Sequence, residues 1–238
     1  MNFIFLGLTG SHAYGLETED SDEDWRGVFW LPTDAFLRTR EPKLVEQHPD
    51  EDITYWEIKH FFGQLIKGSQ NAHELLWLPD EFVSIEEPAF SDVKAIRYNL
   101  MTDALWEHWG GFARSYEYDV KKYVNNADWV AARKHAMHYV RLTRGRFHAA
   151  TEGEIAVSLP EDLRAHLRAI RQGFVSVTEA MDEGKEWDQR AIAAYEGWVP
   201  KADAVGLLDD LLILWRRRWG HIFGYASGSF HYPEGNFK

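Results

Sequence analysis

The sequences GSHAYG at residues 10–15 and SDEDWRGV at residues 21–28 decide how the N-terminal part of this chain folds. The apolar run over residues 2–8 predicts a buried strand that ends at a Thr9-Gly10-Ser11 turn. A second strand is expected from Asp24 to Leu31, where Pro32 ends it. Successive side chains of an extended chain point to opposite faces, so Asp22 and Asp24 are expected on one face.

This pair of aspartates next to a Gly-Ser turn indicates a metal and phosphate site. Carboxylates held side by side repel each other unless a cation lies between them. Mg²⁺ takes one or two carboxylates and leaves its other positions to water and phosphates. Gly10 allows close approach of the backbone, and Ser11 adds a hydroxyl and an N–H group for a phosphate. The pattern therefore favours phosphoryl or nucleotidyl transfer.

Two-metal nucleotidyl transfer needs a further carboxylate near the pair. Asp52, at the head of a strand predicted over residues 52–56, is the first candidate, and Glu57, at the start of the next helix, is the alternative. We therefore expect two Mg²⁺ ions, with Asp22, Asp24 and Asp52 as both catalytic residues and metal ligands. An isolated D-x-D is common on surface loops, and Gly-Ser is ordinary turn chemistry. Only their conjunction with two strands favours a site.

The composition excludes several classes of protein. The 238 residues include no cysteine, which excludes disulfides, thiolate catalysis and cysteine zinc sites. The N-terminus lacks the basic and long apolar regions of a signal peptide, and no segment predicts a membrane span, so a cytoplasmic location is expected. The net charge of −12 argues against broad binding of duplex DNA, but a nucleotide or one RNA end remains compatible with it.

The periodicity predicts an α+β fold: a small mixed β-sheet core with helices over residues 1–85, then a mostly helical half over residues 86–238. Polar residues 47–51 are expected to form a loop, and Thr33 to cap a short helix through Leu37. Residues 155–159 read as a small strand or extended patch and residues 224–238 as a loop. The expected later helices cover residues 57–67, 72–77, 91–103, 105–124, 127–152, 160–182 and 201–223.

One predicted helix is unusually basic for so acidic a chain. Within RKHAMHYVRLTRGR at residues 133–146, Lys134, His138 and Arg141 recur at helical spacing and form one stripe. The stripe could face a cleft and neutralise phosphates, or it could be a solvated helix face. Residues 216–218, all arginine, are read as surface charge, beside partly buried tryptophans at 215 and 219.

The segment GSHAYGLETEDSDEDWRGVF at residues 10–29 resembles the G-S…D-x-D signature of the DNA polymerase β-type nucleotidyltransferase superfamily. More narrowly, it is similar to predicted nucleotidyltransferases of bacteria and phages that are associated with RNA ligases. Their pattern G-S-x-A-Y-G-L-x-T-x-x-S-D-x-D-x-R-G is matched at every fixed position. The likeness continues through Asn71, Glu74 and Leu75, then through residues 134–142 and 169–173. It departs at His12, where arginine is more usual, and at residues 72–73, where Ala-His replaces Pro-Asn.

This resemblance implies magnesium-dependent transfer of a nucleoside monophosphate from a nucleoside triphosphate, with ATP the expected donor. The implied acceptor is the hydroxyl of an RNA or tRNA end, and pyrophosphate is released. Transfer to a protein side chain or small molecule, or a non-catalytic nucleotide-binding role, stays open as an alternative. Tyr14 could stack on a base or be a buried tyrosine. The expected nucleotide-binding residues are Gly10, Ser11, His12, Tyr14, Arg26, Lys134 and His138.

Overall fold

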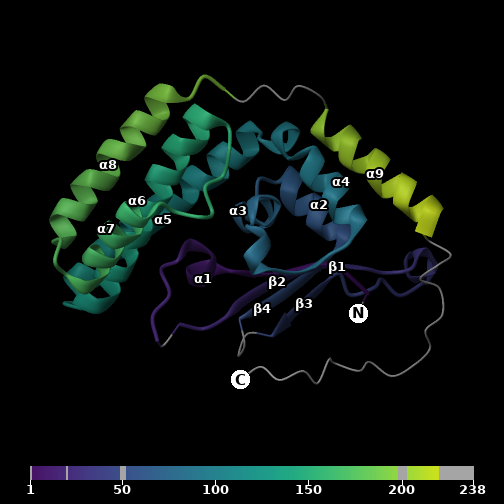
Figure 1. Ribbon diagram of the computed structural model, residues 1–238, viewed down its shortest axis with the longest axis horizontal. Coiled ribbons are helices and arrows are strands. Elements are labelled where there is room, and N and C mark those ends of the chain that lie inside the picture. The colour runs from purple at the N-terminus through teal and green to yellow at the C-terminus, as the bar shows by residue number, and fades with distance from the viewer. Residues whose placement is uncertain (1, 20, 49–51, 198–202, 220–238) are drawn as a thin grey trace.

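The computed structural model describes residues 2–19, 21–48, 52–197 and 203–219. The chain begins with a five-stranded mixed sheet of order β3-β4-β2-β1-β5, and a group of long helices follows it (Figure 1). The predicted α+β architecture is confirmed. The strands are β1 (Asn2–Thr9), β2 (Asp24–Trp30), β3 (Val45–His48), β4 (Ile53–Glu57) and β5 (Val83–Glu86).

The register of the three central strands brings their polar ends together. Strands β1 and β2 are antiparallel, and Thr9 lies opposite Asp24. Strands β2 and β4 are parallel, and Trp25 lies beside Ile53. Asp24 and Asp52 each come one residue earlier, so the parallel register places them next to each other at one edge of the sheet.

Helices cover one face of the sheet (Figure 1). Helices α2 (Ile58–Ile66) and α4 (Pro88–Ala95) contact strands of the sheet, and α9 (Ala204–Trp219) packs on both helices. The short α3 (Gln70–Glu74) follows α2 and runs into a 3₁₀ turn at Leu75–Trp77. Further 3₁₀ turns are Thr33–Leu37, Asp80–Phe82 and Arg97–Leu100.

A bundle of four helices lies beside the sheet. It consists of α5 (Asp103–Asn125), α6 (Trp129–Glu152), α7 (Glu161–Gln172) and α8 (Val177–Ala194). The expectation of one helix over residues 160–182 is wrong. Gly173, at φ +88°, ends α7 in the left-handed region, and Ser176 opens α8 with a capping box to Glu179.

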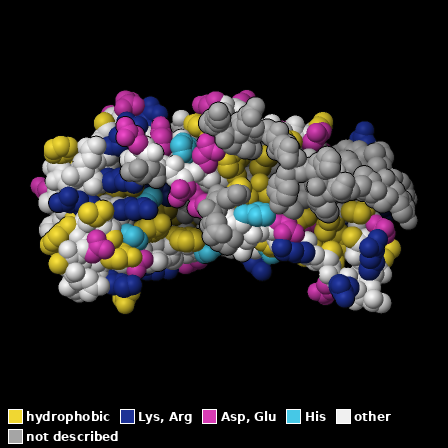
Figure 2. Space-filling view, turned by 90° about the horizontal axis from the view of Figure 1, so that it is seen from below, with side chains coloured by type: hydrophobic (Ala, Val, Ile, Leu, Met, Phe, Trp, Pro, Cys, Tyr) yellow, Lys and Arg dark blue, Asp and Glu magenta, His cyan; other side chains and the backbone are white. Residues whose placement is uncertain are grey.

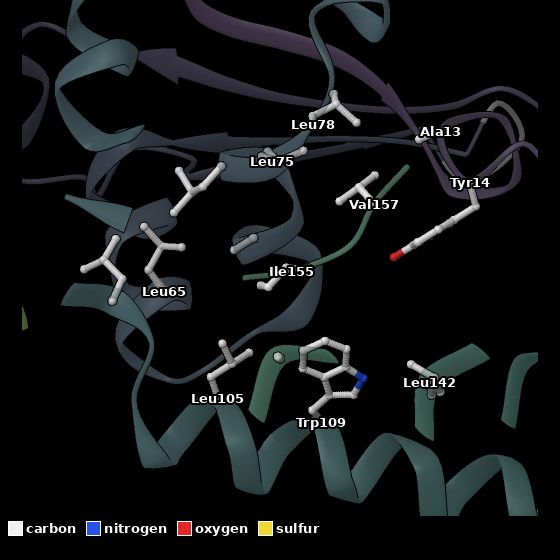
Figure 3. Close-up of a cluster of buried hydrophobic side chains, with 14 of the residues drawn as sticks. Ala13, Tyr14, Leu65, Leu75, Leu78, Leu105, Trp109, Leu142, Ile155 and Val157 are labelled. Atoms are coloured by element: carbon white, nitrogen blue, oxygen red, sulfur yellow. The ribbon is translucent and has the colours of Figure 1, made fainter. Parts of the chain in front are cut away.

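Buried apolar side chains join the bundle to the sheet layer (Figure 3). The segment after α6 has no regular structure and turns Ile155 and Val157 into this core, which confirms the predicted extended patch. Trp109 of α5 packs from below, and Tyr14 reaches in from the N-terminal part of the chain. The core is therefore continuous between the two layers.

Several local expectations near the sheet are wrong. The loop expected from residue 47 begins inside β3, which pairs with β4, and the unpredicted β5 pairs with β1. Both strands are only four residues long, so period-2 alternation was too brief to detect. The turn expected at residues 9–11 is instead the start of helix α1 (Gly10–Tyr14), which ends at Gly15 with φ 65°. Pro32, rather than Thr33, precedes the first 3₁₀ turn.

Arg216 is not a surface charge, which corrects that expectation. Its guanidinium donates 2.6 Å to the Glu57 carboxylate and also donates to the Leu31 carbonyl, while it covers the Trp30 ring. Glu57 is fully buried. Trp215 is 1% exposed, so it is a core residue rather than a partly buried one.

The parts of the chain outside the described ranges include the expected loop at 224–238. No described helix is both long and apolar enough to cross a membrane.

Candidate active site

Two adjoining hollows open where β1 ends and β2 and β4 begin. The larger, of about 250 Å³, is named the acidic pocket here, and the smaller, of about 190 Å³, the aromatic pocket. Gly10, Tyr14, Asp24 and Arg141 line both, so the two form one continuous cleft. The acidic pocket is lined further by Ser11, Leu16, Ser21, Asp22, Asp52, Lys134, Met137, His138 and Arg171. The aromatic pocket is lined further by Thr9, Arg26, Gln70, Asn71, Glu74, Phe112, Tyr116 and Leu142.

The acidic pocket brings together the predicted carboxylates Asp22, Asp24 and Asp52. Asp24 is hydrogen-bonded through its side chain to Asp52, and its own side chain is 22% exposed. Burial, then the bond to Asp52 and its negative charge, raise the pKa of Asp24 to about 7. The same bond lowers the pKa of Asp52. Without a bound cation, the pair is therefore partly protonated near neutral pH.

Arg26 lies between the two carboxylates and ties β2 to β4. Its guanidinium is 3.1 Å from the Asp52 carboxylate and 3.8 Å from that of Asp24, and it donates 2.7 Å to the Asp52 carbonyl. Asp52 has φ 46°, a left-handed conformation that costs energy for a residue with a Cβ. This contact helps to hold the backbone there. Arg26, predicted to bind nucleotide, lines the cleft but is already engaged with both acids.

Gly10 is the glycine that the site requires. It has φ +65°, and a Cβ at this position would overlap the carboxylate of Asp24. The Thr9 hydroxyl donates 2.9 Å to the Asp24 carbonyl, which fixes the start of β2 against the end of β1. The backbone at residues 9–10 is thus in direct contact with the acidic pair, as close approach of a glycine permits.

The carboxylate oxygens of the acidic pocket suit a hard divalent cation that is bound jointly by the protein and a ligand. Within the described ranges, no three His, Cys, Asp or Glu side chains converge closely enough to hold a metal ion by themselves. Mg²⁺ does not require this, because it usually binds one or two carboxylates and completes its shell with phosphate oxygens and water. Burial and the repulsion between the negative charges of Asp24 and Asp52 raise the pKa of Asp24. A cation bound between the two carboxylates would relieve this repulsion. The residues present therefore fit a magnesium ion.

Glu57, the alternative third carboxylate, lies away from the pocket. It is at the opposite end of β4 from Asp52, where it caps α2 by accepting 2.7 Å from the Lys59 N–H and pairs with Arg216. Burial raises the pKa of this carboxyl. Its position favours Asp52 as the third acid of the cleft.

Cations from the helical bundle face the acids across the pocket. Lys134 and His138 of α6 and Arg171 of α7 line the acidic pocket. Burial, then the charges of Arg141 and Lys134, lower the pKa of His138 well below its ordinary value, so its ring is neutral. Among the described residues, neither Lys134 nor Arg171 forms an ion pair with a carboxylate, and Arg171 donates to the Leu16 carbonyl at 3.4 Å. Figure 2 shows Lys and Arg side chains on both halves of the molecule, including the half that holds this bundle.

A buried network lies where the two pockets adjoin. The Tyr14 hydroxyl donates to the Glu74 carboxylate, which also accepts 2.7 Å from the Gln70 amide. Arg141 lies 4.0 Å from this carboxylate and 4.0 Å from the centre of the Tyr14 ring. Its Nε is buried without a hydrogen-bond partner. Tyr14 is therefore a buried tyrosine that joins α1 to α3 and α6, with one ring face already covered by a guanidinium.

Most of the predicted site residues line the cleft, but some cleft residues were not predicted. His12 lines neither pocket, and its Nε2 is buried without a partner. Arg141 belonged to the recognised basic stripe, yet its place at the junction of both pockets was not expected. Phe112 and Tyr116 carried no signal of their own. Only their spacing of four residues on one helix face could have linked them.

Comparisons with known proteins identify the family of this chain. Residues 1–186 match the family model RlaP, described as the RNA repair pathway DNA polymerase beta family. An uncharacterized protein of Methanocaldococcus jannaschii is 31% identical over 117 residues, which are 47% of each chain. The match therefore spans about half the length of that curated relative. No solved structure matches the chain. Since the model covers most of the sequence, the chain belongs to the RNA repair pathway DNA polymerase beta family.

Proposed function

We propose that this member of the RNA repair pathway DNA polymerase beta family transfers a nucleoside monophosphate, AMP first of all, from a nucleoside triphosphate to the hydroxyl of an RNA end. Pyrophosphate is the second product. The observation that carries the proposal is the acidic pocket, where Asp22, Asp24 and Asp52 lie opposite Lys134 and Arg171. Carboxylates for a divalent cation and free cations for phosphates are the two requirements of this chemistry.

The residues of the pocket divide into phosphate-binding and acid–base groups. The Ser11 hydroxyl, Lys134 and Arg171 would bind the oxygens of the triphosphate. Asp24 and Asp52, with Asp22 in the same pocket, would hold magnesium together with phosphate oxygens and water, and the ion when bound supplies charge neutralisation at the reacting phosphate. Asp52, whose pKa is lowered, is ionised and can accept the proton of the attacking hydroxyl. Neutral His138 would act as an outer contact.

An RNA end is the acceptor that the family description supports best. The acidic chain cannot bind a long duplex through many phosphates, so recognition would be confined to one end held near the local cations. The division near residue 85 stays a prediction. In this proposal the helical half over residues 86–238 supplies the cations and the sheet half supplies the carboxylates.

The test is incubation with α-labelled ATP, Mg²⁺ and separate RNA, protein and metabolite fractions. We expect label in the RNA fraction, release of pyrophosphate, and loss of both in the Asp22→Asn/Asp24→Asn double variant. Asp34→Asn is the matched control, because Asp34 is an exposed aspartate paired only with Arg38. Label in protein or metabolites would refute the RNA acceptor, and unchanged biological activity of the double variant would refute catalysis.

A further inference from the structure

The aromatic pocket has a chemistry different from that of the acidic pocket beside it. Its wall on the bundle side consists of Phe112 and Tyr116 of α5 and Leu142 of α6, while α3 contributes the amides of Gln70 and Asn71. Four charged residues line it, and each lies beside an opposite charge: Glu74 and Arg141 in the buried network, and Asp24 and Arg26 next to Asp52. This pocket therefore suits a flat, neutral, partly polar group.

The two pockets are placed so that one ligand can occupy both. They share Gly10, Tyr14, Asp24 and Arg141 as lining residues, so they adjoin along these four residues. The uncompensated cations Lys134 and Arg171 lie only in the acidic pocket. A ligand with a polyphosphate at one end would put that end in the acidic pocket and its uncharged end in the aromatic pocket.

We propose that the aromatic pocket binds the base of the nucleotide substrate, and that Asn71 selects adenine. The inference rests on the proposed function, because it assigns the phosphates of the same nucleotide to the acidic pocket.

Phe112 is the stacking residue of this site. It is 38% exposed, a large fraction for an aromatic ring that lines a pocket. Tyr116, one turn further along α5, is packed against His138 with ring centres 5.2 Å apart, which fixes its orientation. A base between these side chains and Leu142 would cover the Phe112 ring, and stacking on an aromatic ring is a recurrent way to bind bases.

Asn71 is the polar group available to read the edge of the base. The Gln70 amide is already committed to Glu74, at 2.7 Å. Asn71 is exposed, and no hydrogen bond of its side chain occurs among the described residues. A side-chain amide offers one donor and one acceptor, which together match the N6 amino group and N7 of adenine. Guanine presents two acceptors at the same edge and pairs less well.

Binding measurements on the full chain test this assignment. The probes are non-hydrolysable α,β-methylene analogues of ATP, GTP, CTP and UTP with Mg²⁺, and inorganic tripolyphosphate with Mg²⁺. For the wild type we expect ATP analogue to bind about tenfold more tightly than GTP analogue. Phe112→Ala and Phe112→Leu should weaken all four analogues about tenfold and leave tripolyphosphate unchanged. Asn71→Ala should weaken the ATP analogue alone and remove the preference.

Tyr118→Ala is the matched control, because Tyr118 is a 69% exposed aromatic of the same helix that lines neither pocket. Equal binding of the analogues by wild type and the Phe112 variants would overturn the inference while leaving the proposed function intact. A parallel loss of tripolyphosphate affinity would overturn it as well. The expected binding pattern without any transfer of label would support the base site and refute the proposed reaction.

Discussion

Replacement of Asp24 by asparagine is expected to stabilise the metal-free protein at alkaline pH while it abolishes nucleotidyl transfer. Burial, the bond to Asp52 and the charge of Asp52 raise the pKa of Asp24 from 3.8 to about 7. A carboxyl that holds its proton more tightly in the folded chain stabilises the fold fully at low pH. That stability is lost as the pH rises through the folded pKa. An amide has no such proton to lose.

The magnitude follows from the pKa shift. A rise from 3.8 to about 7 corresponds to roughly 4 kcal/mol, at about 1.4 kcal/mol for each unit. The Asp24 side chain is 22% exposed and lies 3.8 Å from the Arg26 guanidinium, and both reduce the effect. We therefore expect the free energy of unfolding of the variant to exceed that of the wild type by about half of this value, ~2 kcal/mol. The advantage of the variant should grow between about pH 4 and about pH 7 and then level off.

Urea unfolding in EDTA, followed by tryptophan fluorescence at about pH 4.5 and about pH 8, measures this difference. Asp22→Asn is the matched control, because Asp22 lines the same pocket but is exposed. It should lose transfer without gaining stability. The electrostatic reasoning would be refuted by an Asp24→Asn protein that is less stable than wild type at the higher pH, or by a difference that does not change with pH.

Three further substitutions test other parts of the structure. Arg216→Met leaves the fully buried Glu57 carboxylate unpaired. It should lower the free energy of unfolding by about 3–5 kcal/mol near neutral pH. The deficit should shrink in acid, where Glu57, whose pKa is raised, takes up a proton; a constant deficit in urea titrations would contradict this. Gly10→Ala should abolish transfer and destabilise the fold, since its Cβ overlaps the Asp24 carboxylate. Gly63→Ala, where a Cβ meets nothing, should instead stabilise helix α2 by about 1 kcal/mol in the same assay.

The part of the fold that could be predicted from the sequence is the part with long, regular patterns. Strand β1 and the long helices α5 and α6 follow from apolar runs and helical spacing. Strands β3 and β5 could not be predicted because each has only four residues, and β5 in addition pairs with the distant strand β1. The break between α7 and α8 has a sequence signal, because Gly173 and the Ser176–Glu179 capping box mark a helix end and a helix start.

The candidate site shows the same division. Asp22, Asp24 and Gly10 could be found because their chemistry is local to one motif. The position of Asp52 beside Asp24 depends on the pairing of β2 with β4. The alternation of apolar and polar residues does not show which strands pair. The place of Arg141 between the pockets depends on how α6 packs against α1 and α3, and only the tertiary structure fixes this.

The buried contact between α9 and the end of β4 has a practical consequence. The family match ends at residue 186, whereas Arg216 and Trp215 belong to a helix beyond it. A shortened polypeptide that stops at the matched boundary would strip the cover from Glu57 and expose apolar surface of α2 and α4 to water. Such a fragment should aggregate on expression, so biochemical work on this protein should retain the segment through residue 219.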